Sequence, residues 1–287
     1  MHIAESIASV RPAIAAARAG GRTIGFVPTM GALHAGHVSL IDRCRADGCF
    51  TVVSIFVNPT QFGPNEDLNR YPRTLDADRT ACERAGVDVI FAPTAEEMYP
   101  PGEQTRVRPG RLADTLCGPF RPGHFEGVCT VVAKLFNIVQ PDVTYFGQKD
   151  AQQALILRRM AIDLAMPVQI VTCPIVRDAD GLALSSRNAL LSREERSHAL
   201  ALYRALCIGR DAILRGEASI GRIVAAMRNA VVQSAGSAVI DYLSLVDPDT
   251  LEPITPHCPR VLIAGAIRLG GVRLIDNLTV EIPPPTP

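Results

Sequence analysis

Two histidines, His34 and His37, stand three residues apart just beyond a short apolar run at residues 23–27. The run predicts a strand, a proline and a glycine end it, and an apolar helix begins near the histidines. This order places backbone N–H groups and the positive end of a helix dipole at one point, which favours anions. Gly36 between the histidines lets a ligand approach the backbone. The stretch therefore predicts a site for nucleotide phosphates.

Other interpretations of the histidine pair have less support. Such pairs also occur as ordinary surface or core residues. Metal binding would need more ligands, and no Cys, Asp or Glu stands near enough in the sequence to suggest them. The glycine-rich P-loop and the G-x-G-x-x-G fingerprint are both absent. The pair therefore predicts neither a Walker site nor a dinucleotide site.

Polar residues also follow two later predicted strands. Gln61 lies in the loop after the strand at 51–57, and the turn Gly147-Gln148-Lys149-Asp150 follows the strand at 143–146. Ligands of open α/β sheets bind at the carboxyl ends of the strands. Gln61 is therefore well placed to hydrogen-bond a ligand, although a loop this rich in Asn, Gly and Pro is usually only a turn.

A second group of anion-binding residue types follows at Ser185, Ser186 and Arg187. A guanidinium binds phosphate oxygens bidentately, and serine hydroxyls add short donors. The alternative is a purely structural loop before a helix, since Ser192 followed by Glu195 is the pattern of a capping box. The residues alone leave both interpretations open.

The totals narrow the class of protein. A length of 287 residues predicts two domains. Lys+Arg and Asp+Glu balance at 29 each, which argues against nucleic acid or a membrane surface as the main partner. The eight cysteines show no C-x-x-C spacing, no apolar run reaches about 18 residues, and no signal-peptide pattern is present. We therefore expect free thiols in a cytoplasmic protein.

Strands and helices alternate in the first part of the chain, which predicts an α/β fold with a doubly wound parallel sheet at residues 1–176. A smaller α+β domain is expected at 177–287. Its predicted hairpin turns at Gly270-Gly271, and residues 283–287 are expected to form a frayed tail. The expected helices span 4–19, 37–45, 74–86, 125–139, 151–164, 193–215 and 219–235, and the expected strands 23–27, 51–57, 87–91, 143–146, 168–176, 239–246, 260–268 and 272–276.

Six segments occur in a specific order: V-P-T-M-G-A-L-H-A-G-H, F-V-N-P-T-Q-F-G, Y-P-R-T, R-P-G-H-F-E-G-V, F-G-Q-K-D-A-Q-Q and L-S-S-R-N. With them the chain resembles the pantoate–β-alanine ligase (pantothenate synthetase) family over nearly its whole length. The H-x-G-H pattern alone would indicate only the nucleotidyltransferase superfamily. The resemblance implies a Rossmann-like N-terminal domain that binds ATP and pantoate, and a C-terminal domain that closes over the ATP site. It also implies dependence on ATP and Mg²⁺, and a homodimer.

The resemblance also assigns roles to residues. His37 holds the position of the family's proton donor, and the catalytic set is His34, His37, Lys149 and Arg187. Gln61 and Gln153 match the residues that hold pantoate, and Gln61 also lies beside β-alanine. The ATP-binding residues implied are Met30, Gly31, Ala32, Leu33, His34, Ala35, Gly36, His37, Gly147, Gln148, Lys149, Asp150, Val176, Leu184, Ser185, Ser186 and Arg187, the last four matching the family's version of the KMSKS loop.

The magnesium ligands stay open in the sequence. Asp76 and Asp78 lie near the place where the family's metal-binding acid falls, and Asp78 is the candidate. Three positions depart from the residues more common in the family: Leu184 replaces Met, Gln148 replaces Glu, and Ala151 replaces Tyr. Leu for Met conserves volume, Gln148 removes a charge beside Lys149, and Ala151 leaves a small gap. None of these changes removes a residue assigned to the chemistry.

The implied reaction condenses (R)-pantoate with β-alanine and converts ATP to AMP and diphosphate through a pantoyl adenylate. One rival is a nucleotidyltransferase that leaves the adenylyl group on its product and does not consume β-alanine. Another is a catalytically inactive nucleotide-binding regulator. That rival requires the loss of a catalytic residue, and all four are present: His34, His37, Lys149 and Arg187.

Overall fold

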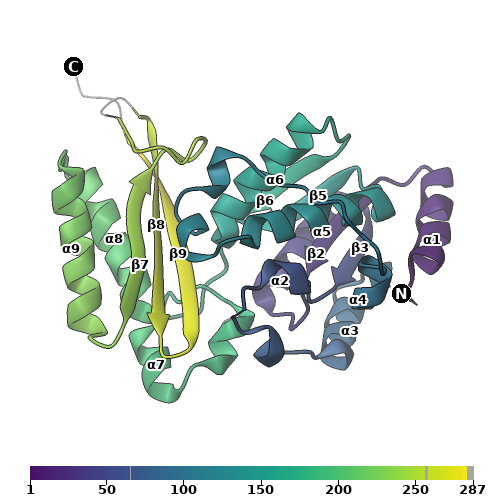
Figure 1. Cartoon of the computed structure of the whole chain (residues 1–287), viewed down its shortest axis with the longest axis horizontal. Coiled ribbons are helices and arrows are strands. Elements are labelled where there is room, and N and C mark those ends of the chain that lie inside the picture. The colour runs from purple at the N-terminus through teal and green to yellow at the C-terminus, as the bar shows by residue number, and fades with distance from the viewer. Residues whose placement is uncertain (65, 256–257, 283–287) are drawn as a thin grey trace. The chain divides into compact units, whose positions relative to one another are not determined.

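The computed structural model describes residues 1–64, 66–255 and 258–282, which divide into two compact units (Figure 1). The predicted tail at 283–287 lies outside the described residues. The two domains predicted at 1–176 and 177–287, with their separate roles, stay a prediction. The first unit comprises Met1–Gly110, Arg121–Gln148 and Gln153–Val176, and the second comprises Arg111–Phe120, Lys149–Gln152 and the described part of 177–287.

The first unit is built on a six-stranded sheet in the order β1-β4-β3-β2-β5-β6, and all its strand pairs are parallel. The doubly wound parallel sheet is therefore confirmed. The sequence missed β1, because three residues are too few to show a period. The strands are β1 (His2–Ala4), β2 (Ile24–Thr29), β3 (Phe50–Ile55), β4 (Val89–Phe91), β5 (Val143–Gly147) and β6 (Gln169–Cys173).

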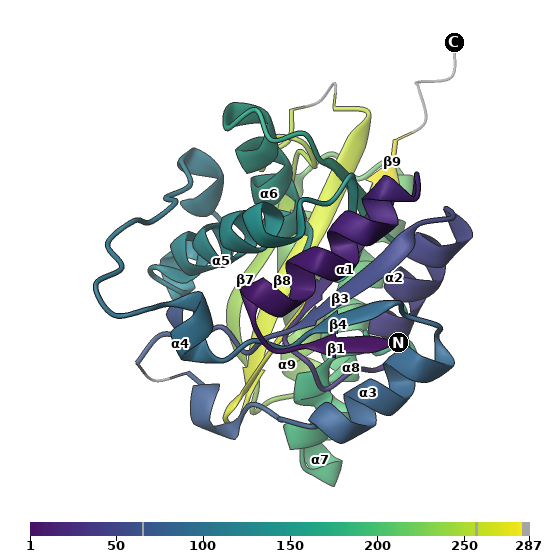
Figure 2. The ribbon, with the colours of Figure 1, turned by 90° about the vertical axis from the view of Figure 1, so that its right-hand side faces the viewer.

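Helices cover both faces of this sheet. Val27, Val53 and Ile90 form one apolar cluster with residues of α2 and α3. Against the opposite face, α1 and α5 contact each other and β2, and α1 lies across the sheet in Figure 2. Burial on both faces explains why these strands read as continuous apolar runs. The helices are α1 (Ile7–Ala19), α2 (Ala35–Ala46), α3 (Leu75–Arg84), α4 (Ala95–Met98), α5 (His124–Val139) and α6 (Ala151–Asp163).

The second unit has an antiparallel sheet of β7 (Val239–Val246), β8 (Arg260–Leu269) and β9 (Val272–Glu281). The predicted hairpin is confirmed: Leu269 pairs with Val272, and Gly270 has φ 53°. Helices α8 (Leu200–Leu214) and α9 (Ile220–Ser234) pack against the sheet, next to the strands in Figure 1. The helix predicted at 193–215 is in fact two, because the turn at Ala199 separates α7 (Arg193–His198) from α8. Ala199 keeps helical angles, so no helix-breaking residue marks this turn.

Candidate active site

The loop between β2 and α2 carries two consecutive residues with left-handed backbone angles. Gly31 has φ 78° and Ala32 has φ 50°. A Cβ atom at Gly31 would lie 2.9 Å from Asp78 Oδ2 and 3.0 Å from Ile55 Cγ2, so a larger residue does not fit. The left-handed region costs a non-glycine residue such as Ala32 about 1–2 kcal/mol. The loop therefore needs partners that hold it in this shape.

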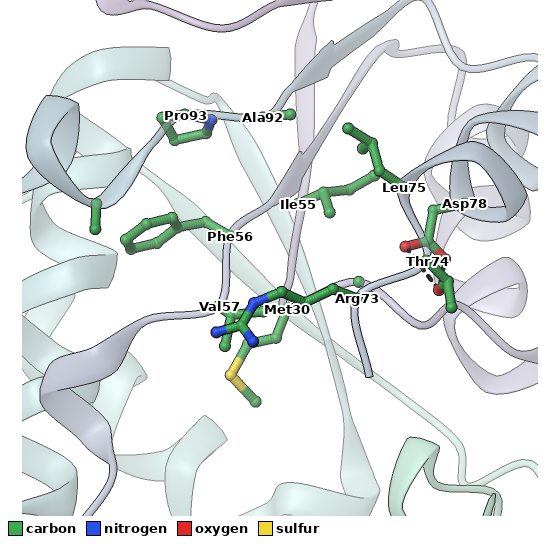
Figure 3. Close-up of a pocket in the computed structure, with 12 residues that line it drawn as sticks. Met30, Ile55, Phe56, Val57, Arg73, Thr74, Leu75, Asp78, Ala92 and Pro93 are labelled. Carbon is green, nitrogen blue, oxygen red and sulfur yellow. Dashed lines mark hydrogen bonds between the residues drawn. The ribbon is translucent and has the colours of Figure 1, made fainter. Parts of the chain in front are cut away.

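The side chain of Asp78, in α3, holds the loop in this shape. It is buried, and Ala32 N donates to Oδ2 at 3.0 Å while Leu33 N donates to Oδ1 at 2.7 Å. The Thr74 hydroxyl lies 3.3 Å from both oxygens. Figure 3 shows Thr74 and Asp78 side by side, with these contacts dashed. Two N–H groups of the segment predicted to bind phosphate are therefore directed at a carboxylate of the protein itself.

The two histidines cap the start of α2. Gly36 N donates to His34 Nδ1 at 3.1 Å, and His34 N donates to His37 Nδ1 at 3.4 Å. Since each Nδ1 accepts a hydrogen bond, the proton of each neutral ring lies on Nε2. The ring centroids are only 4.1 Å apart. The site thus holds two neighbouring Nε2–H donors at the positive end of a helix dipole, an arrangement suited to an anion.

Gln61 lies beside the same segment. It ends a short 3₁₀ turn after β3, and its Nε2 is 3.2 Å from the sulfur of Met30. Asn58 Nδ2 donates to Gln61 Oε1 at 3.0 Å, and Tyr99 Oη donates to Asn58 Oδ1 at 2.7 Å. The structure therefore brings Gln61 and Met30 together. Asn58 was not predicted as a site residue, although it is buried and stands in the segment F-V-N-P-T-Q-F-G.

A charged cluster holds the backbone of Gln61. Arg121 donates to both carboxylate oxygens of Glu66 at 2.7 and 2.6 Å, and its Nη1 lies 2.9 Å from His124 Nε2. Because an arginine side chain can only donate, His124 Nε2 accepts this bond. The proton of the neutral His124 ring then lies on Nδ1, which donates to Gln61 O at 2.9 Å. Burial raises the pKa of Glu66, but the bonds and charge of Arg121 outweigh this and hold it below its usual value. The segment R-P-G-H-F-E-G-V thus contains positioning residues that the sequence did not reveal.

A cavity of about 290 Å³ opens beside Met30 and Gly31 (Figure 3). Its other lining residues are mostly apolar, and they come from the loops after β3 and β4 and from the start of α3. Asp78 also lines the cavity, so the loop and the carboxylate that holds it both border this space. Further lining residues are Ile55, Phe56, Val57, Arg73, Thr74, Leu75, Ala92, Pro93 and Ala95.

In the second unit, an ion pair holds the base of the predicted KMSKS-like loop. Arg177 donates to both oxygens of Asp276, at 2.6 and 2.9 Å, and its guanidinium lies 4.1 Å from the ring centre of Tyr203. The Asp276 side chain is only 5% exposed, so the pair is desolvated. Arg196 forms a second, more exposed bridge to Asp178 and Asp180.

Shorter bonds shape the tip of this loop. Ser185 Oγ accepts from Arg187 N at 3.3 Å and caps the 3₁₀ turn Ser186–Leu190. The capping box predicted at Ser192 is confirmed, because Glu195 N donates to Ser192 Oγ and Ser192 N to Glu195 Oε2. Ser185 and Ser192 thus both have a capping role, and phosphate binding by Ser185 and Ser186 stays a prediction. Capping uses an acceptor lone pair of Ser185, and the hydroxyl can still donate its own hydrogen.

The remaining predicted residues divide between the two units. Gln152, which was not predicted as a site residue, is buried, donates to Leu112 O and Thr115 O, and accepts from Cys117 N. Asn277 Nδ2 donates to Lys149 O at 3.1 Å. Both sets of bonds lie within the second unit, which also contains Asp150, Leu184, Ser185, Ser186 and Arg187, whereas Gly147, Gln148, Gln153 and Val176 belong to the first.

The expectation of free thiols is confirmed, since all eight cysteines are unpaired and seven of them are buried. Within the described part of the chain, no group of three or more His, Cys, Asp or Glu side chains could hold a metal ion. No helix among the described residues is both long enough and apolar enough to cross a membrane.

The six-stranded parallel sheet and the small antiparallel sheet define a Rossmann-like α/β protein. The family model for pantoate-beta-alanine ligase matches residues 2–279. The pantothenate synthetase of Moorella thermoacetica is 53% identical over 282 residues, which cover 98% of this chain and 99% of that protein. The chain therefore belongs to the pantoate–β-alanine ligase family, whose members are ligases that make pantothenate from pantoate and β-alanine.

Solved structures agree with this assignment. The pantothenate synthetase of Thermus thermophilus is 47% identical, with a TM-score of 0.91 over 99% of this chain and 100% of that one. The pantoate-beta-alanine ligase of Francisella tularensis is 34% identical, with a TM-score of 0.77 over 97% of each chain. The Francisella structure is a complex with beta-gamma ATP and β-alanine.

Proposed function

We propose that the chain condenses (R)-pantoate with β-alanine to pantothenate, converting ATP to AMP and diphosphate through a pantoyl adenylate. The observation that carries this proposal is the family match over residues 2–279, which includes the loop with the histidine pair. The Francisella complex supports ATP and β-alanine as substrates. A homodimer in the cytoplasm is part of the same proposal.

The first chemical step joins pantoate to the nucleotide. The carboxylate of pantoate is ionised at pH 7, so it needs no general base to attack the α-phosphate. A P–O bond forms to the carboxylate oxygen as the bond to diphosphate breaks. This step needs alignment and neutralisation of charge on the phosphates and the leaving diphosphate. The Nε2–H groups of His34 and His37 are suited to donate to phosphate oxygens, and the family position makes His37 the proton donor.

Other residues are proposed to bind ATP through their side chains. Lys149 and Arg187 carry positive charge, and the hydroxyls of Ser185 and Ser186 are short donors. We propose that Mg²⁺ arrives with the ATP phosphates and neutralises part of their charge. Magnesium keeps several of its waters and is commonly held by substrate phosphates with few protein ligands, which fits this route.

The second step forms the amide bond. The neutral amine of β-alanine attacks the acyl carbon of the adenylate, AMP leaves with the electron pair of the broken C–O bond, and the amine gives up a proton. Water competes for this mixed anhydride and must be excluded. The closing role proposed for residues 177–287 serves this purpose.

The amide groups of Gln61 and Gln153 are proposed to bind the hydroxyls of pantoate, and Gln61 also to lie beside β-alanine. The contacts of Gln61 with Met30 and Asn58 support its proposed role, because they hold the amide in place in the loop after β3. A pocket whose buried amides need a substrate hydroxyl strongly rejects acids that lack it.

The decisive assay follows AMP release by the purified protein with ATP, Mg²⁺, pantoate and β-alanine, and then with each component omitted. Sustained AMP release is expected only when all are present. Without β-alanine, diphosphate release should stop after about one turnover, because the adenylate stays bound. Continued formation of an adenylylated product without β-alanine would instead identify a nucleotidyltransferase. Nucleotide binding with no turnover would identify a regulator.

A further inference from the structure

We propose that Asp78 is a positioning residue that fixes the loop at residues 31–33, and that it is not a ligand of magnesium. The anchoring role rests on contacts within the first unit. The claim about magnesium concerns the ATP-dependent reaction and so rests on the proposed function. The anchoring role is an alternative to the metal role that the sequence suggested for Asp78.

The hydrogen bonds of Asp78 account for both of its oxygens. Oδ2 accepts from Ala32 N and Oδ1 from Leu33 N, and the Thr74 hydroxyl is within 3.3 Å of each. The residue is 2% exposed. A carboxylate offers about four lone-pair sites, and these donors already engage both oxygens. The two backbone N–H groups and the single hydroxyl hydrogen of Thr74 take three of these sites, so a metal ion would have to share the two oxygens with the donors that hold the loop.

The position of Asp78 in the fold suits a negatively charged side chain. Asp78 stands in the first turn of α3, where the helix dipole stabilises a negative charge. The two backbone donors come from adjacent residues in a turn of left-handed conformation, an arrangement that forms an anion-binding concavity. In this protein a side chain occupies that concavity. The carboxylate of Asp78 therefore accepts N–H groups that the sequence predicted would bind a phosphate of the nucleotide.

The shape of this loop determines where the histidines lie. Leu33, whose N–H is bound by Asp78, directly precedes His34, the N-cap of α2. The left-handed angles of Gly31 and Ala32 turn the chain from β2 into that helix. Without the carboxylate, the loop can relax toward more common backbone angles. Both imidazole rings would then move from the positions that their capping bonds define.

The test compares Asp78→Asn with Asp76→Asn, an exposed carboxylate on the same helix. The asparagine keeps the size of Asp78 but turns an –NH₂ group toward one of the two backbone donors. In ligand-free, metal-free protein, amide exchange of the peptide covering residues 30–35 should be faster in Asp78→Asn and unchanged in Asp76→Asn. Equal protection in all three proteins would overturn the anchoring role, whatever the protein catalyses.

Single-turnover adenylate formation then separates an anchor from a metal ligand. At saturating ATP and Mg²⁺ we expect Asp78→Asn to slow this step about 10²-fold, as a small displacement of reacting groups does. The Mg²⁺ concentration giving half the maximal rate should stay at the wild-type value. A large rise in that concentration, with the rate restored by excess Mg²⁺, would show that Asp78 is a metal ligand.

A milder variant, Thr74→Val, keeps the proposal testable if the Asp78→Asn protein fails to fold. Thr74→Val removes only the hydroxyl that approaches both oxygens of Asp78. It should increase amide exchange and slow adenylate formation in the same direction, by a smaller factor and with unchanged Mg²⁺ dependence. Wild-type behaviour of a folded Asp78→Asn protein in both measurements would refute the proposal. If the wild type forms no adenylate at all, the proposed function fails while the exchange result still stands.

Discussion

The two loops assigned to ATP are held in different ways. The loop at residues 30–37 is anchored through its own backbone, because a buried carboxylate accepts the N–H groups of Ala32 and Leu33. The loop at residues 177–188 is anchored at its base through side chains, chiefly by the pair of Arg177 and Asp276. Its tip is shaped by bonds between residues close in sequence.

This difference predicts which property of the protein should change when each anchor is lost, the rate of catalysis or the free energy of unfolding. A backbone anchor fixes the path of the loop itself, so its loss should appear mainly in catalysis. The ion pair at the base of the other loop is desolvated, so breaking it leaves the largely buried guanidinium of Arg177 without its partner. Its loss should appear mainly in the free energy of unfolding. The following variants test this division, from the largest expected effect to the smallest.

Asp276→Ala should lower the free energy of unfolding by about 3–5 kcal/mol, because it leaves the largely buried guanidinium of Arg177 without its partner. Urea unfolding, analysed with its slope, measures the change. Asp178→Ala, which breaks a more exposed bridge of Arg196, is the control and should cost far less. A loss below about 1 kcal/mol for Asp276→Ala would show that the base of the loop is not held as described.

His37→Ala should slow single-turnover adenylate formation by about 10²–10³-fold, the typical cost of removing one donor to a developing charge. Rapid quench with labelled ATP measures this step. The free energy of unfolding should change little, since the ring of His37 is only half-buried. Adenylate formation at the normal rate would remove His37 from the proposed chemistry.

Two adjacent glutamines provide a matched pair. Gln153→Ala should raise the KM for pantoate about tenfold, because a hydroxyl of the bound substrate loses its partner, and the KM for ATP should hardly change. Gln152→Ala should instead reduce stability, because Gln152 is buried and binds three backbone groups. Steady-state kinetics and urea unfolding of both variants test this contrast. An unchanged KM for pantoate would remove Gln153 from the pocket.

Asp180→Asn should have the smallest effect, about 0.5 kcal/mol or less, because its bridge to Arg196 is exposed. The hydrogen bond from Arg196 is the main cause that holds the pKa of Asp180 below its usual value of 3.8. A lowered pKa in the folded state stabilises the protein above the ordinary pKa. The difference between wild type and variant should therefore be present at pH 7 and disappear as the pH falls below about 4. A difference that grows as the pH falls through the acid range would contradict the sign.

Much of the fold could be predicted because it depends on local patterns. The continuous apolar runs predicted β2, β3 and β5, and the capping box predicted the start of α7. The turn at Ala199 and the three-residue β1 were missed, because neither leaves a signal in the residue types. For the candidate site the sequence proposed the histidines and Gln61, and the structure shows the contacts that hold them. The sequence missed Asn58, Arg121 and His124, whose roles depend on bonds to segments far away in the chain.

By itself the sequence determined the family and the order of most strands and helices, because periodicity, caps and motifs are properties of neighbouring residues. Only the tertiary structure decided which nitrogen of each histidine carries the proton and which carboxylate binds the loop. Asp78 meets Leu33 across 45 residues of sequence. No spacing rule predicts such a bond, because it exists only once β2 and α3 have packed in the same fold.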